Sequence, residues 1–359
     1  MIPVTKPFIP PILEYQKILK GIWKRNWLTN HGPLANELEM NLKEFLKVCN
    51  IFYVTNGTIA IQMSIKALGL KGEVITTPFS YVATTSSLVW EGCIPVYVDI
   101  DPDTLNIDAT KIEAAITPKT TGILATHCFG NPCDIEAIQK IATKHGLKVI
   151  YDAAHCFATQ YKGKSVFEYG DISTTSFHAT KLFHTVEGGA VFTNQKSIAE
   201  QLIFLRNFGH DGPEKFNGVG INGKNSELHA AMGLVNLKYI QQILDRRKQQ
   251  TKYYHQTLAG INLKYIKLQD EQGFNYAYFP VVFETEELTL HVKKILENNQ
   301  IFPRRYFYPS LSQLDYVTGN TPISDDIASR ILCLPLYHEL TKEEQDLVSR
   351  ILVKAYKSF

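Results

Sequence analysis

Long hydrophobic runs are missing from this sequence. No apolar run approaches the roughly 18 residues that a membrane-spanning helix needs. The opening segment, MIPVTKPFIPPILEY, is rich in proline and only weakly apolar, which does not fit a secretion signal. We therefore expect a protein that acts in the cytoplasm without binding a membrane.

The sequence also lacks an excess of charge of one sign. Its 37 basic and 35 acidic residues give a formal net charge of +2 and are spread along the chain. The most basic patch, KILKGIWKR at 17–25, is short and fits a solvent-exposed helix face. Without a dense block of lysine and arginine, we expect no nucleic-acid partner.

Paired cysteines are absent as well. The six cysteines are scattered and form no C-x-x-C pair, so reduced thiols fit better than disulfides. A zinc site is conceivable, although its spacing matches no known zinc signature and we expect no metal. Its ligands would be His127, Cys128, Cys133 and His155.

The sequence does have a regular alternation of apolar runs and helix-like segments between about residues 55 and 195. This alternation predicts an α/β domain whose mostly parallel sheet is covered by helices on both faces. The expected strands are 73–79, 94–100, 121–129, 147–154, 172–177 and 188–194. The expected helices are 56–70, 80–92 and 134–146, each beginning at Asn, Ser or Asp.

The rest of the chain predicts a second, smaller domain. Residues 225–260 form one long helical pattern that would connect the two parts. A strand is expected at 275–284, with helices at 288–300 and 342–356. We predict a large α/β domain over residues 1–250, including the N-terminal segment, and a small α+β domain over 251–359.

Two features at predicted strand ends suggest a cofactor site. Gly57 and Thr58 leave backbone N–H groups uncovered at a helix start, which favours phosphate binding. Asp152 follows an apolar strand directly, where a buried carboxylate needs a cationic partner or hydrogen-bond donors. Taken singly, each feature has an alternative: the start at Gly57 and Thr58 could follow an ordinary N-cap, and Asp152 could be an N-cap or lie in a surface turn.

The third feature is Lys181, which lies among aromatic and apolar neighbours ahead of a glycine pair. Such surroundings favour loss of its proton, and a neutral amine can attack a carbonyl. Most lysines are simply exposed. A phosphate socket, a strand-end acid and an amine are together what pyridoxal 5'-phosphate requires. The sequence therefore predicts this cofactor, with Lys181 and Asp152 as catalytic residues.

The chain also resembles the DegT/StrS sugar aminotransferases in a series of motifs between about residues 20 and 350. The motifs are WLTNHGPLANELE, NGTIAI, TPFSYVAT, VDIDPDTLNID, HCFGNPCD, YDAAH, GDISTTSFHATKLFHTVEGGAVFTN, NSELHAAMG and RILCLPLYHEL. The resemblance implies the fold-type I, aspartate aminotransferase-like architecture. It also implies transfer of an amino group from L-glutamate to a nucleotide-linked keto-sugar, with release of 2-oxoglutarate.

Position by position, the resemblance makes Lys181 the lysine that forms a Schiff base with the cofactor. Asp152 becomes the partner of the pyridine nitrogen, and Tyr81 the aromatic residue that stacks on the cofactor ring. His155 stands near the ring oxygen, where many members have glutamine, and a histidine can still donate there.

The resemblance also supplies residues for the phosphate and for a second subunit. Ser176 matches the hydroxyl that holds the phosphate beside Gly57 and Thr58. Asn222 matches the asparagine that reaches the neighbouring subunit's cofactor, while Lys224 replaces an arginine. Either residue could bind the phosphate or the carboxylate of the amino donor, and we place Asn222 first. We therefore expect a homodimer with shared active sites, and helix packing at a subunit contact is the alternative for this segment.

The spellings SFHATK and EGG resemble the branch that aminates C4 of the sugar more than the C3 branch, which reads SFYPGK. This predicts a dTDP-linked 4-keto-6-deoxyhexose, with the glucose-derived one first. The product would be dTDP-4-amino-4,6-dideoxyglucose for a surface glycan such as lipopolysaccharide O-antigen. His178 and His184 could contact the sugar or the diphosphate, although packing under the turn is equally open for His184.

The segment FPRRYFYPS could bind the rest of the substrate. Arg304 and Arg305 could hold the diphosphate, and Tyr306 or Tyr308 could stack on the base. A surface turn is the alternative for either arginine.

Other functions are less consistent with the sequence. GVGING at 218–223, with Asp245 downstream, spells a dinucleotide-binding fingerprint, but a polar loop precedes it where a strand is needed. A sugar dehydratase of the same fold would have histidine in place of Lys181. A C3 aminotransferase and a non-catalytic sensor remain as alternatives, although no DNA-binding appendage is present.

Overall fold

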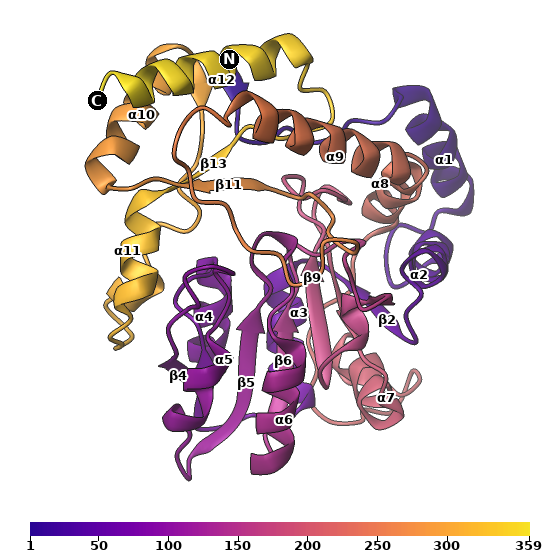
Figure 1. The fold of residues 1–359 in the computed structure, drawn as a ribbon. Helices are drawn as coiled ribbons and strands as arrows, with labels where there is room; N and C mark the ends of the chain where they lie inside the picture. Colours follow the sequence, from indigo (N-terminus) through magenta and orange to yellow (C-terminus); the bar gives the residue numbers. More distant parts are fainter.

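The computed structural model describes residues 1–359 and contains a central seven-stranded sheet in the order β2-β10-β9-β6-β5-β3-β4 (Figure 1). Its strands are β2 (Ile51–Val54), β3 (Glu73–Thr76), β4 (Ile94–Tyr97), β5 (Thr120–Thr126), β6 (Lys148–Asp152), β9 (Ile172–Ser176) and β10 (Gly189–Phe192). β10 runs antiparallel to both neighbours, and the other pairs are parallel. The predicted α/β class is confirmed, and each predicted strand of the first half lies in this sheet.

Helices pack around the sheet and bury its apolar residues. They are α1 (Ile12–Arg25), α2 (Pro33–Leu46), α3 (Gly57–Ala67), α4 (Val82–Trp90), α5 (Ala109–Ile112), α6 (Ile135–His145) and α7 (Lys196–Leu205). A short hairpin, β7 (Gln160–Tyr161) with β8 (Lys164–Ser165), lies outside the sheet. The predicted helices correspond to α3, α4 and α6.

The N-caps of these helices follow from the sequence in two of three cases. The side chain of Asn56 accepts from the N–H of Ile59 at 2.9 Å, and Asp134 caps α6 in the same way. The third case is wrong, because Tyr81 rather than a serine precedes α4. The hydroxyl of Ser80 instead bonds to the hydroxyl of Thr84 at 2.7 Å.

The predicted long helix over 225–260 is two helices, α8 (Glu227–Leu237) and α9 (Ile240–Thr257). The two pack against different partners, since α8 lies against α2 and α9 against the C-terminal helix. Glu227, fully buried, accepts the N–H groups of Leu34 and Ala35 at the start of α2, each at 2.9 Å. These separate contacts hold the two helices on different axes.

The C-terminal half forms a smaller α+β layer above the large sheet in Figure 1. Its elements are β11 (Phe279–Val282), α10 (Glu286–Asn298), β12 (Ile301–Phe302), α11 (Pro322–Arg330), β13 (Ile331–Leu334) and α12 (Lys342–Lys357). β11 and β13 pair antiparallel. The first strand of the chain, β1 (Ile2–Pro3), pairs with β12, and Ile2 lies in the core of this half. Ile2 and Pro3 at the start of the chain therefore pack with the C-terminal half.

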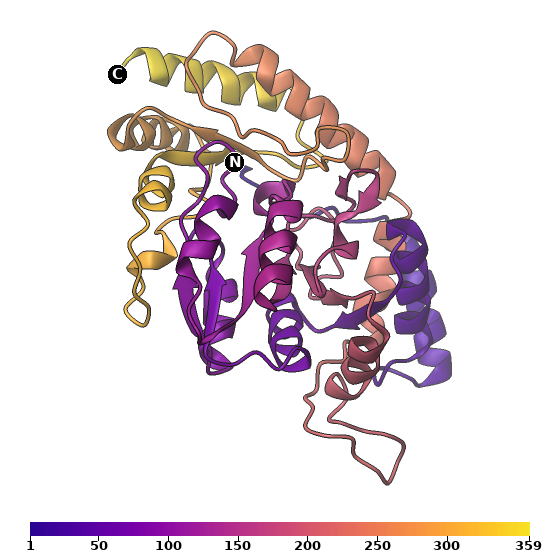
Figure 2. The same cartoon turned by 60° about the horizontal axis from the view of Figure 1, so that its bottom comes forward.

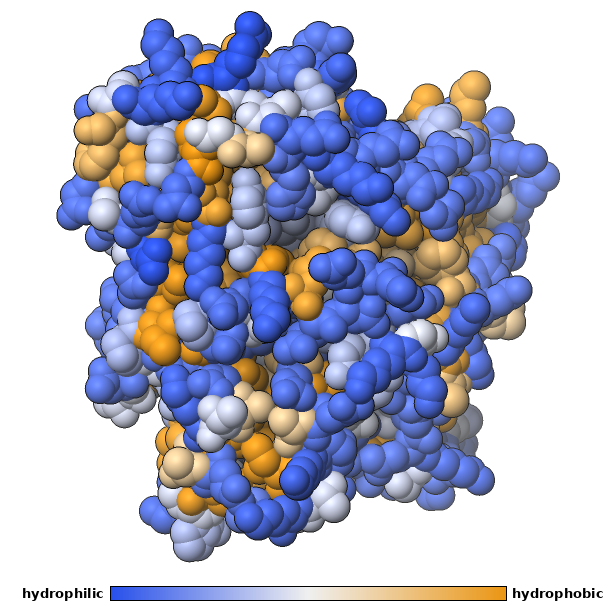
Figure 3. Space-filling view, in the orientation of Figure 1, coloured by the Kyte–Doolittle hydropathy of each residue, from blue (hydrophilic) through white to orange (hydrophobic).

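The segment between α7 and α8 projects away from the body of the molecule (Figure 2). It carries exposed apolar side chains, including Phe216 and Val219, which is 89% exposed. The face shown in Figure 3 is mostly hydrophilic, with hydrophobic residues gathered in patches. None of the helices is both long enough and apolar enough to cross a membrane.

Candidate active site

The carboxyl ends of neighbouring parallel strands bring two predicted site residues to one edge of the sheet. Asp152 ends β6 and Ser176 ends β9, the strand paired with it. The start of α3 reaches the same edge, because a Cβ added to Gly57 would lie 3.0 Å from the Cβ of Ser176. Ser176 and the start of α3, at Gly57 and Thr58, thus lie side by side, and a serine hydroxyl beside the first N–H groups of a helix suits a phosphate.

The second glycine of the EGG motif allows this close approach. A Cβ at Gly189 would lie 2.5 Å from both the carbonyl carbon and the oxygen of Asn56. Real Cβ atoms do not tolerate such a distance, so only glycine lets the first residue of β10 pass beneath the start of α3.

Asp152 is a buried carboxylate without a basic partner. It is 6% exposed and accepts from the hydroxyl of Thr84 at 2.7 Å and from the N–H of Ala154 at 3.1 Å. Burial raises its pKa, while these hydrogen bonds and the charge of Lys181 act in the opposite direction. A carboxylate held in this way lacks a cation, which the protonated ring nitrogen of pyridoxal phosphate would supply.

Lys181 lies in the turn-rich segment between β9 and β10. Its Nζ makes one hydrogen bond, to the hydroxyl of Tyr278 at 3.5 Å. Burial lowers the pKa of Lys181, opposed first by the charge of Asp152. The amine therefore loses its proton more easily than an exposed lysine does, as attack on a carbonyl requires.

His155 and Tyr81 line the same site. The Nδ1 atom of His155 accepts from the N–H of Phe129 at 3.1 Å, so the proton of the neutral ring is assigned to Nε2. Burial holds the pKa of His155 well below its usual value, which keeps the ring neutral. Tyr81 is 61% exposed and makes no cap bond at the start of α4, so its ring is free to stack on a ligand.

The two predicted arginines, Arg304 and Arg305, have different partners in the structure. Arg304 is exposed and donates to the hydroxyl of Tyr306 at 3.3 Å, and this hydrogen bond raises the pKa of Arg304. Arg305 turns the other way, where it pairs with Glu286 at 2.6 Å and packs 3.5 Å from the centre of the Tyr308 ring. Arg304 and Tyr306 are therefore available to a substrate, whereas Arg305 and Tyr308 bind each other.

The two histidines that flank Lys181 also differ. His178 is half-buried, bonds to the hydroxyl of Thr180 at 2.8 Å and lies 3.5 Å from Glu187. His184 is only 4% exposed, and its Nε2 lies 2.7 Å from the carbonyl oxygen of Phe8. The geometry favours the packing role for His184, because a buried ring bonded to the backbone has no free edge for a sugar.

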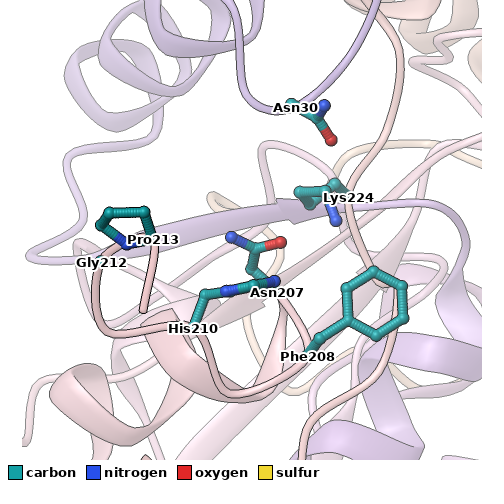
Figure 4. Close-up of a pocket in the computed structure, with 7 residues that line it drawn as sticks. All are labelled: Asn30, Asn207, Phe208, His210, Gly212, Pro213 and Lys224. Carbon is teal, nitrogen blue, oxygen red and sulfur yellow. The ribbon is translucent and has the colours of Figure 1, made fainter. Parts of the chain in front are cut away.

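Asn222 and Lys224 bind each other at 2.8 Å and make no hydrogen bond or ion pair to Lys181, Asp152 or Ser176 of the same chain. Lys224 lines an open pocket of about 440 Å³, where its Nζ lies 4.7 Å from the centre of the Phe208 ring (Figure 4). The other lining residues are Asn30, Asn207, His210, Gly212 and Pro213.

Two residues of the site were missed in the sequence. Thr84 lies one helical turn after Tyr81 and is buried. Its hydroxyl on the inner face of the predicted helix was the feature from which it could have been recognised as a site residue. Tyr278 lies 97 residues from Lys181 and read only as part of a strand, so no local pattern connected them.

The structure removes two alternatives. The four residues of the conceivable zinc site form no ligand set, and no three His, Cys, Asp or Glu side chains gather to hold a metal. Both histidines instead accept backbone N–H groups, His127 from Cys133 and His155 from Phe129. The GVGING segment follows α7 and a loop rather than a strand, so it is no dinucleotide fingerprint.

Comparison with known proteins agrees with this geometry. Residues 13–353 match the model of the DegT/DnrJ/EryC1/StrS aminotransferase family. The chain belongs to this family. It is therefore a pyridoxal 5'-phosphate-dependent aminotransferase, and the buried acid, the lysine and the phosphate cradle described above fit that cofactor.

Two curated relatives and one solved structure illustrate the similarity. The chain is 45% identical, over 95% of each chain, to a dTDP-4-amino-4,6-dideoxy-D-glucose transaminase of Shigella dysenteriae. It is 40% identical, over 98% of each chain, to a protein of the same name from Escherichia coli. The crystal structure of DesI in the presence of its TDP-sugar product superimposes with a TM-score of 0.92 at 31% identity, covering 99% of this chain and 93% of the other.

Proposed function

We propose that this aminotransferase moves the amino group of L-glutamate to C4 of dTDP-4-keto-6-deoxyglucose, giving dTDP-4-amino-4,6-dideoxyglucose. The observation that carries the chemistry is the buried, cation-free Asp152 near a half-buried Lys181 whose pKa is lowered. The sugar is supported by the names of the two relatives at 45% and 40% identity, which extend over nearly the whole chain. The product would serve a surface glycan such as lipopolysaccharide O-antigen. The six free thiols and a nucleotide-linked substrate support a cytoplasmic location.

The residues at the edge of the sheet would hold the cofactor. Ser176 and the N–H groups of Gly57 and Thr58 would bind its phosphate, helped by the positive end of the α3 dipole. Tyr81 would cover one face of the ring, and His155 would donate from Nε2 to the ring oxygen.

Asp152 and Lys181 would perform the proton chemistry. When bound, pyridoxal phosphate supplies the carbonyl that carries the amino group and a ring that accepts negative charge. Asp152 would keep the ring nitrogen protonated, and Thr84 would fix the orientation of its carboxylate at 2.7 Å. Lys181 would take the proton from the α-carbon of glutamate and return a proton to C4 of the sugar in the second half of the reaction.

Arg304 and Tyr306 would bind the nucleotide end of the substrate. The guanidinium is exposed and free of any carboxylate, so it can form charge-assisted hydrogen bonds to a diphosphate. His178, half-buried beside Lys181, would contact the sugar. These assignments leave Arg305 and His184 with structural roles.

We further propose that the enzyme is a homodimer with shared sites. The projecting segment between α7 and α8 exposes apolar side chains, among them Phe216 and Val219, and Asn222 lies on it without a contact to its own Lys181. Asn222 would reach the cofactor of the second subunit, with Lys224 beside it. Mixing Lys181→Ala chains with Asn222→Ala chains should restore part of the activity, since one site of each heterodimer is then intact. A monomer in sedimentation at assay concentration, or no restored activity from chains shown to exchange, would refute shared sites.

A substrate panel tests the proposed reaction. Purified enzyme is given L-glutamate with dTDP-, UDP- and GDP-linked 4-keto-6-deoxy sugars, and 2-oxoglutarate release is measured. We expect the highest kcat/KM with dTDP-4-keto-6-deoxyglucose. Activity confined to UDP- or GDP-linked sugars would overturn the substrate and leave the cofactor chemistry standing.

A further inference from the structure

The amine of Lys181 and the hydroxyl of Tyr278 have each other as their single side-chain hydrogen-bond partner, at 3.5 Å. They come from different parts of the fold, since Lys181 lies between β9 and β10 of the large sheet and Tyr278 immediately precedes β11 of the smaller layer. We propose that Tyr278 is a positioning residue that holds the free amine of Lys181 in place for proton transfer. The inference rests on the proposed catalytic role of Lys181.

The ring of Tyr278 is held by aromatic neighbours. Its centre lies 4.5 Å from the centre of the His155 ring. Phe129 and Tyr306 approach it nearly edge-on, each with a centre-to-centre distance of 5.9 Å. Contacts of this kind restrict the ring, so its hydroxyl cannot easily move away from Lys181.

The backbone beside Tyr278 is fixed to both halves of the molecule. The amide of Asn275 donates to the carbonyl oxygens of His155 at 2.8 Å and Phe157 at 2.9 Å. Asn275 also accepts a hydrogen bond from the N–H of Ala277. The carbonyl oxygen of Ala277 in turn accepts a hydrogen bond from the buried Arg247 at 2.8 Å. The segment is thus hydrogen-bonded both to α9 and to the loop after Asp152, which fixes the position of Tyr278 relative to the catalytic edge of the sheet.

A phenol suits both protonation states of the amine. Burial raises the pKa of Tyr278, so its proton stays on the oxygen throughout the working pH range. That oxygen can accept from a protonated Lys181, and its O–H can donate to the lone pair of the neutral amine. Tyr306 and Tyr81 also lie at this site, but neither makes a hydrogen bond to Lys181, and the hydroxyl of Tyr306 accepts from Arg304 instead. Tyr278 is therefore the residue that can hold the amine while it gains and loses a proton.

The test uses Tyr278→Phe, which removes one hydroxyl and keeps the ring. The matched control is Tyr276→Phe, because Tyr276 lines a cavity of about 270 Å³ beside α9 and makes no hydrogen bond to Lys181. In cofactor-free protein, labelling of Lys181 by limiting acetic anhydride is followed by mass spectrometry across a pH series. We expect the labelling midpoint of Tyr278→Phe to fall by about half a pH unit, since the charge-assisted bond from the protonated amine to the phenol oxygen is stronger than the bond from the phenol to the neutral amine. Tyr276→Phe should match the wild type.

Steady-state kinetics supply the second readout. In Tyr278→Phe, kcat should fall roughly tenfold while KM for glutamate stays within about twofold, as expected for a misplaced amine. An unchanged midpoint, or an equal shift in Tyr276→Phe, would overturn the inference even if transamination is observed. A shifted midpoint in an enzyme that fails to aminate any keto-sugar would support the inference and refute the proposed function.

Discussion

The hydroxyl of Thr84 donates to Oδ2 of Asp152 at 2.7 Å, and this bond orients the one buried acid of the active site. Thr84 lies on the first turn of α4 and Asp152 at the end of β6, so the bond also fixes α4 to the sheet. A carboxylate held at both oxygens, by Thr84 and by the N–H of Ala154, keeps its charge available on the ligand side.

Changes at Asp152 and Thr84 should therefore affect turnover to different degrees. Asp152→Asn should lower kcat by several orders of magnitude, because the charge opposite the ring nitrogen is lost, with each tenfold equal to about 1.4 kcal/mol. Thr84→Val should lower kcat roughly tenfold, because the carboxylate remains but is less well oriented. Single-turnover rates and circular dichroism check both variants. Near-normal turnover in a folded Asp152→Asn protein would make the acid structural.

Lys181 should carry the cofactor covalently. Borohydride reduction followed by peptide mapping should place the label on Lys181, and Lys181→Ala should lose turnover while still binding pyridoxal phosphate through Ser176 and the start of α3. Lys224→Ala is the control and should keep the label on Lys181. Recovery of the label on another lysine of the wild type would show that the assignment is wrong.

Gly189 gives a prediction about stability. Gly189→Ala puts a Cβ 2.5 Å from backbone atoms of Asn56, which should destabilise the fold by about 1–3 kcal/mol and weaken cofactor binding. Gly260→Ala is the matched control, because nothing lies within 4 Å of a Cβ there. Urea unfolding and cofactor titration measure the two effects. Equal behaviour of the two variants would contradict the close approach of β10 to α3.

Substitution of one adjacent arginine should weaken substrate binding, and substitution of the other should lower the stability of the fold. Arg304→Ala should raise KM for the nucleotide sugar about tenfold, and KM for glutamate should change little. Arg305→Ala should leave KM for the sugar near the wild-type value and lower the free energy of unfolding, because it breaks the contact with Glu286. If Arg305→Ala were the variant with the raised KM, the assignment of the substrate contacts would be reversed.

The sequence predicted the central sheet and the residues at its carboxyl edge because these depend on local patterns. Gly57, Asp152 and Lys181 each lie next to an apolar strand or a helix start, and such positions converge in a parallel sheet. The paired residues Arg304 and Arg305, like His178 and His184, could not be told apart, because sequence adjacency does not say which way a side chain turns. Tyr278 depends on docking of the C-terminal half, and the break between α8 and α9 depends on separate packing partners. Both follow from tertiary contacts that local propensity does not contain.

The position of the transferred nitrogen in the product decides whether the enzyme aminates C4. Enzyme, dTDP-4-keto-6-deoxyglucose and ¹⁵N-labelled L-glutamate are incubated, and the sugar ring of the purified product is examined by NMR. Transamination at C4 predicts ¹⁵N bonded to C4 of a 4,6-dideoxy sugar, with stoichiometric 2-oxoglutarate. Nitrogen at C3, or no labelled sugar from active, cofactor-loaded enzyme, would contradict it.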